Sequence, residues 1–110
     1  MEAVNPHDAI EFLYKWSSIY AKAKATRVYL EEFRKSKKAL LMQTSLESAV
    51  TAQERDAYAH PEYLQLLAGL REAVEQEESL RWKLIAAQAK IEVWRTESVN
   101  NRALDRVAGI

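Results

Sequence analysis

Two rows of apolar residues run along the stretch LRWKLIAAQAKIEVW, residues 80–94. The first row repeats every three or four residues, which is the spacing of one face of an α-helix. We call it the seam row, and it consists of Tyr63, Leu66, Leu70, Ala73, Glu77, Leu80, Leu84, Ala87, Ile91, Trp94 and Ser98. No proline follows Pro61. The pattern therefore predicts one long helix over residues 61–106.

The N-terminal part of the chain carries an equivalent row. It consists of Ala9, Phe12, Trp16, Ile19, Ala23, Thr26, Leu30, Phe33, Lys37 and Leu40. Asn5-Pro6 precedes it. Asn caps free amides at a helix start and Pro is tolerated in the first turn. We therefore predict a second long helix over residues 6–42.

The segment between the rows contains two sequences of capping-box form, Thr44–Glu47 and Thr51–Glu54. They predict a short helix within residues 45–59. Pro61 disfavours helical geometry at His60, so we expect a break there. The predicted fold is all-α: residues 1–110 form a single helical domain, a long, coiled-coil-like antiparallel hairpin with a short connecting helix.

Each row contains one charged residue, Lys37 in the first and Glu77 in the second. If residues whose numbers add to about 114 face each other, Lys37 and Glu77 pair and fix the register of the hairpin. Another alignment places Glu77 nearer Arg27. A solvated seam edge without either pair is an equal alternative.

A second apolar row, which we call the outer row, lies roughly opposite the seam row. It consists of Trp82, Ile85, Ala86, Ala89 and Val93. A two-helix hairpin covers only one side of this helix, and a large exposed apolar patch is unusual on a soluble monomer. We therefore expect self-association through the outer row, most simply as a dimer forming a four-helix bundle. Base stacking is the alternative role for Trp82.

The composition excludes several function classes. The chain has 16 Lys+Arg, 16 Asp+Glu and no Cys, so no net field attracts nucleic acid or lipid, and thiolate chemistry is absent. The acidic cluster around Glu72 and Glu75 has no histidine at metal-binding spacing, and no catalytic motif occurs. From these missing motifs we expect that the protein is not an enzyme and has no cofactor or metal. The sequence has no signal-like or membrane-spanning run, so we expect a cytoplasmic protein without membrane contact.

Local positive charge leaves one ligand class open. Basic residues gather between residues 22 and 38 and near the C-terminal end of the second long helix. The candidates for contacts with nucleic-acid phosphates are Lys24, Arg27, Arg34, Lys35, Lys38, Arg102 and Arg106. The alternative is an ordinary wet surface on which Glu31 pairs with Arg34 or Lys35.

Four stretches resemble a family of small α-helical proteins encoded by tailed phages and prophages. They are residues 27–39, residues 52–59 with Ala57-Tyr58-Ala59, residues 91–96 with Ile91-Glu92-Val93-Trp94-Arg95, and residues 101–103. The genes of such proteins look like neighbours of phage recombination and replication genes. The resemblance therefore implies a genomic setting, and it carries over no site residues. Two hypotheses follow. The chain is an accessory in phage DNA recombination or replication that contacts a phage protein or single-stranded DNA, or it is a small inhibitor of a host defence or replication complex.

Overall fold

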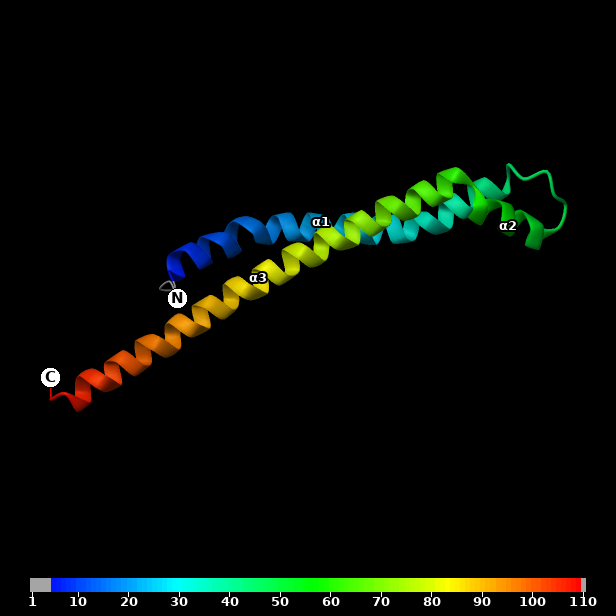
Figure 1. The fold of residues 1–110 in the computed structure, drawn as a ribbon. Helices are drawn as coiled ribbons and strands as arrows, with labels where there is room; N and C mark the ends of the chain where they lie inside the picture. Colours follow the sequence, from blue (N-terminus) through cyan, green and yellow to red (C-terminus); the bar gives the residue numbers. More distant parts are fainter. Residues whose placement is uncertain (1–4, 110) are drawn as a thin grey trace. The chain divides into compact units, whose positions relative to one another are not determined.

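The regular structure of the chain is entirely helical across residues 5–109, the part that the computed structural model describes. Figure 1 shows three helices, α1 (Pro6–Met42), α2 (Val50–Ala59) and α3 (Pro61–Val107). The predicted all-α class is confirmed, and no strand occurs within the described range.

The ends of α1 are set by side chains that hydrogen-bond to the backbone. At the start, Asn5 Oδ1 accepts hydrogen bonds from the backbone N–H groups of His7 (3.0 Å) and Asp8 (3.4 Å), as expected of an N-terminal cap. At the end, the Thr44 hydroxyl donates to the Leu41 carbonyl at 2.7 Å. Carbonyls left free by the last turn are thereby satisfied.

The two capping-box sequences do not cap α2, which corrects that part of the sequence interpretation. The helix begins after Ala49, which forms no side-chain cap. Ser45 instead donates to Asp56 Oδ2 at 2.7 Å, and Gln53 Nε2 donates to the Glu47 carbonyl at 2.9 Å. These two bonds join the loop to α2. A side chain that is engaged in such a bond is no longer free to cap a helix start.

The predicted break at His60 is present. His60 has extended backbone geometry, with φ −67° and ψ 136°, as expected for a residue before proline. Its Nδ1 accepts the backbone N–H of Glu62 at 3.1 Å. His60 therefore caps α3, which the sequence pattern did not indicate.

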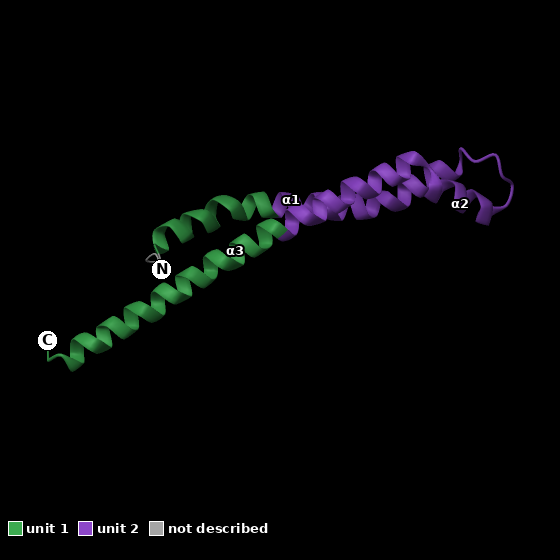
Figure 2. Ribbon diagram, viewed as in Figure 1, with its two compact units in different colours: residues 1–20, 79–110 green, residues 21–78 purple. Residues whose placement is uncertain are grey.

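Contacts divide the chain into two compact units (Figure 2). The first unit contains the described residues up to 20 and from 79 onward, and the second contains residues 21–78. In the second unit, residues 21–42 of α1 run antiparallel to residues 61–78 of α3, and α2 joins them at the closed end. Leu41, Ala57 and Tyr63 form a buried cluster there, one from each helix.

The register of the second unit is fixed by Arg27 and Glu77. Arg27 Nη2 lies 3.0 Å from Glu77 Oε1, and Arg27 Nε donates to the other carboxylate oxygen. Glu77 is only 6% exposed, so the solvated seam edge is excluded. Arg27 also donates to Glu31 at 3.1 Å. The hydrogen bonds to Glu77 and Glu31 raise the pKa of Arg27, so it remains charged.

The alignment that pairs Lys37 with Glu77 is wrong. Lys37 Nζ instead lies 3.0 Å from Glu62 Oε2. The physical reason is the shape of the donors: a guanidinium matches both oxygens of one carboxylate, whereas an ammonium is a point charge that pairs equally well at a wetter position. Arg27 therefore pairs with Glu77, the more buried of the two carboxylates.

The α1 row shifts by one residue at two places. Thr26 and Leu40 are exposed, while their neighbours Arg27 and Leu41 face inward. The Thr26 hydroxyl donates to the Lys22 carbonyl of its own helix at 3.0 Å. Because a straight helix drifts relative to a strict heptad pattern, the inward-facing position moves along the row.

The first unit buries small and aliphatic residues of both long helices. Ala9, Leu80 and Ala87 are 5–7% exposed. Trp94, expected in the seam, is 42% exposed, so that expectation is wrong. The seam row is therefore not buried along its full length.

The Arg27–Glu77 pair makes a testable contribution to stability. We expect Arg27→Met and Glu77→Leu each to lower the midpoint of thermal unfolding by roughly 10 °C, because each leaves one charged side chain in the seam without its partner in this pair. The double variant Arg27→Met/Glu77→Leu should recover at least half of this loss, since an apolar pair fills the same place. Circular dichroism during heating measures the midpoints.

The control is Arg95→Gln, which removes an ion pair with Glu92 in which both side chains are about 65% exposed. Exposed pairs contribute little, so this midpoint should stay close to that of the parent chain. A double variant as unstable as the sum of its two single variants would contradict the proposed coupling.

Candidate nucleic-acid interface

A hollow of about 510 Å³ lies in the second unit. It is lined by three cations of α1, by one tyrosine of α2 and by one tyrosine of α3. These residues are Arg34, Lys35, Lys38, Tyr58 and Tyr63. We call this hollow the basic groove. Three of the seven basic residues selected from the sequence thus share one site.

The two tyrosines are positioned by the core of the closed end. Tyr63 is 7% exposed and belongs to the cluster of Leu41 and Ala57. The ring of Tyr58 lies at 75° to that of Tyr63, with 5.3 Å between the centroids, which is a favoured edge-to-face arrangement. Tyr58 remains 46% exposed. The groove therefore presents one fixed aromatic ring to solvent.

Lys38 is held against this ring. Its Nζ lies 4.8 Å from the centroid of the Tyr58 ring and 3.5 Å from Glu54 Oε1. Hydrogen bonding to Tyr58, and then the charge of Glu54, raise the pKa of Lys38 although burial opposes the charge. Lys38 therefore carries a fixed positive charge at the edge of the groove.

The other two cations are more available to a ligand. Lys35 Nζ lies 3.3 Å from Glu32 Oε2, but both side chains are about 70% exposed, so water competes strongly for this pair. Arg34 is exposed and has no ion-pair partner among residues 5–109. Glu31 pairs with Arg27 rather than with Arg34 or Lys35, so the predicted neutralisation of the basic surface by Glu31 does not occur.

The remaining basic candidates lie elsewhere. Arg27 is engaged in the seam by Glu77 and Glu31. Lys24 is exposed on α1 and does not line the groove. Arg102 and Arg106 are exposed near the end of α3 in the first unit, and Arg102 Nε donates to the Ser98 carbonyl at 3.4 Å.

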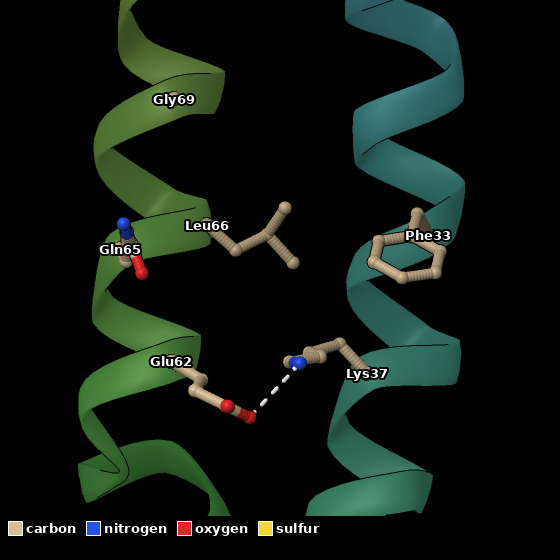
Figure 3. Close-up of a pocket in the computed structure, with 6 residues that line it drawn as sticks. All are labelled: Phe33, Lys37, Glu62, Gln65, Leu66 and Gly69. Carbon is tan, nitrogen blue, oxygen red and sulfur yellow. Dashed lines mark ion pairs between the residues drawn. The ribbon is translucent and has the colours of Figure 1, made fainter.

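A second hollow, of about 330 Å³, lies between Phe33 and Lys37 of α1 and residues of α3 that include Glu62 and Leu66 (Figure 3). The ion pair of Lys37 and Glu62 sits at its edge. Because the cation and the carboxylate neutralise each other, this hollow is a poorer anion site than the basic groove.

The outer row of α3 is exposed along its full length. Trp82 is 59% exposed, Ile85 37% and Val93 43%, and Ala86 and Ala89 are exposed as well. The guanidinium carbon of Arg81 lies 5.2 Å from the Trp82 ring centroid. The row thus forms a partly exposed apolar surface within the first unit.

Within residues 5–109, no cluster of three or more His, Asp or Glu side chains could hold a metal ion. None of the described helices combines the length and the apolar character needed to cross a membrane.

The sequence interpretation missed Tyr58 as a site residue and assigned Tyr63 only to the seam. The spacing of Arg34, Lys35 and Lys38 indicates a basic helix face, but nothing local says that α2 returns a tyrosine to that face. This juxtaposition depends on the packing of α2 against the other two helices in the cluster of Leu41, Ala57 and Tyr63, which is a tertiary contact.

Comparison of the chain with protein-family models, curated proteins and solved structures gives no match.

The Lys37–Glu62 pair predicts a dependence of stability on pH. Lys37 lowers the pKa of Glu62 below its ordinary value of 4.5. The stability from this pair is therefore present above pH 4.5 and is lost as the pH falls through the lower, folded-state pKa. We expect Glu62→Gln to lower the unfolding midpoint slightly at pH 7 and to leave it unchanged at pH 2, as measured by circular dichroism. An equal loss at both pH values would contradict this assignment.

Proposed function

We propose that this chain is a non-catalytic helical interaction protein that self-associates through the outer row of α3. In this proposal it serves as a cytoplasmic accessory in phage DNA recombination or replication, through contacts with a protein or with single-stranded DNA. The observation that carries the proposal is the exposure of the outer row, above all Trp82 at 59% and Val93 at 43%.

The outer row supports association because it is continuous and apolar. Its members repeat along one helix face over residues 82–93, and burying apolar surface contributes about 25 cal/mol per Å². Tryptophan is enriched at interfaces. Two chains that pack these rows together would form a four-helix dimer with a closed two-fold interface, in which the two α3 helices contact each other.

The role in DNA metabolism is supported by the lining of the basic groove, which brings Arg34, Lys35 and Lys38 beside Tyr58. The phage setting is proposed from the resemblance of the sequence alone, in stretches that include these four residues. Cations beside an exposed aromatic ring are the features with which proteins bind single-stranded nucleic acid.

Solution mass tests the self-association. Size-exclusion chromatography with light scattering, at two protein concentrations, should give a mass of two chains of 12.7 kDa each. The variant Trp82→Gln/Val93→Gln should move to the mass of one chain, because the apolar contact is lost. The control Leu46→Gln changes an exposed apolar residue of the loop and should keep the parent mass.

A parent chain that remains at 12.7 kDa at both concentrations would contradict the self-association. The outer row would then be free for a different protein, which is how an inhibitor of a host complex would use it.

A further inference from the structure

We propose that the basic groove binds single-stranded DNA, with a base stacked on Tyr58 and the neighbouring phosphates held by Arg34 and Lys35. This inference rests on the proposed role in DNA metabolism and adds the site, the ligand class and an aromatic residue. It does not depend on the outer row, which lies in the other unit.

The orientation of the Tyr58 ring is restricted before any ligand binds. The Lys38 ammonium lies 4.8 Å from its centroid and Tyr63 meets it at 75°. These two contacts limit the rotation of the ring, so little side-chain freedom is lost when a base packs against its exposed part. Stacking tolerates any base, since every base has a flat face.

The cations of the groove differ in what they can give a phosphate. Arg34 has five N–H donors and no ion-pair partner among residues 5–109, so it can hold two phosphate oxygens at once. Lys35 can exchange its exposed partner Glu32 for a phosphate at small cost. Lys38 is retained by Glu54 and contributes positive potential.

The size and lining of the groove also fit a nucleotide. Its volume of about 510 Å³ falls within the range of about 300–1,000 Å³ that is typical of small-ligand sites. All five lining residues are cations or tyrosines. Every nucleotide offers both an anion and a flat aromatic surface, whereas the Asp and Glu residues of an acidic peptide offer the anion alone. The half-exposed tyrosine therefore favours single-stranded DNA.

Fluorescence anisotropy of a 5′-labelled oligothymidylate of 20 nucleotides tests this proposal with the full-length chain. At 50 mM salt the parent chain should bind it, and Tyr58→Leu should weaken binding roughly tenfold through loss of stacking. Tyr58→Phe keeps the ring and should bind within about twofold of the parent chain. Tyr29→Leu is the matched control, because Tyr29 is a 63% exposed tyrosine of α1 that does not line the groove; its affinity should stay unchanged.

Salt dependence isolates the phosphate contacts. Two contacts predict that affinity falls roughly sevenfold between 50 and 200 mM salt, since the logarithmic slope is about −0.7 per contact for single strands. Arg34→Gln should reduce that slope by about 0.7. Arg34 is exposed, so this variant keeps the proposal testable even if Tyr58→Leu does not fold.

Three results would overturn the groove proposal: no binding of the oligothymidylate at 50 mM salt, equal affinity for the parent chain and a folded Tyr58→Leu, or displacement by polyglutamate that Tyr58→Leu does not alter. The last result would identify an acidic peptide site. Light scattering on the same samples separates this test from that of self-association. A single-chain species that binds through Tyr58 supports the groove alone, and a two-chain species that ignores the oligonucleotide refutes it.

Discussion

The two hydrogen bonds from the Arg27 guanidinium to the Glu77 carboxylate are the constraint on which the second unit depends. A carboxylate that is 6% exposed is costly unless charge and hydrogen bonds compensate it, and a guanidinium supplies both to its two oxygens. Sliding α1 along α3 by one turn would leave Glu77 buried without this partner. Apolar side chains along the seam tolerate several alignments, because Leu, Ala and Phe pack against one another in many ways. The ion pair therefore selects one register from several that the apolar rows allow.

The chosen register has a consequence at the closed end of the hairpin. It places Lys37 beside Glu62 and leaves Tyr63 in the cluster with Leu41 and Ala57. The helix α2 packs on the same cluster and brings Tyr58 to Lys38. The basic groove is thus a product of the register, since its residues come from all three helices and no single helix contains the site. The first unit buries Ala9, Leu80 and Ala87 and leaves the outer row exposed.

The helical periodicity of the sequence predicted the fold class and the break at His60, because apolar spacing and proline act locally. It left the register open between Arg27 and Lys37, since both choices satisfy the same apolar pattern and differ only in donor geometry. It misplaced Trp94 in the core, because a repeating pattern does not say which of its members the partner helix covers. The cations Arg34, Lys35 and Lys38 were recognisable as a basic face, whereas the position of Tyr58 depended on how α2 packs against α1. Local chemistry was thus predictable, and contacts between distant segments were not.

Zero-length carbodiimide cross-linking followed by peptide mass spectrometry tests the register most directly. The reagent joins a lysine amine to a carboxylate only where the amine and the carboxylate are already in contact. A mixture of isotope-labelled and unlabelled chains distinguishes links within one chain from links between chains. The account predicts an intrachain link between Lys37 and Glu62, whose charged atoms lie 3.0 Å apart, and a second link between Lys38 and Glu54. An intrachain link between Lys37 and Glu77 would show that the helices pack in the other register, and would contradict the account.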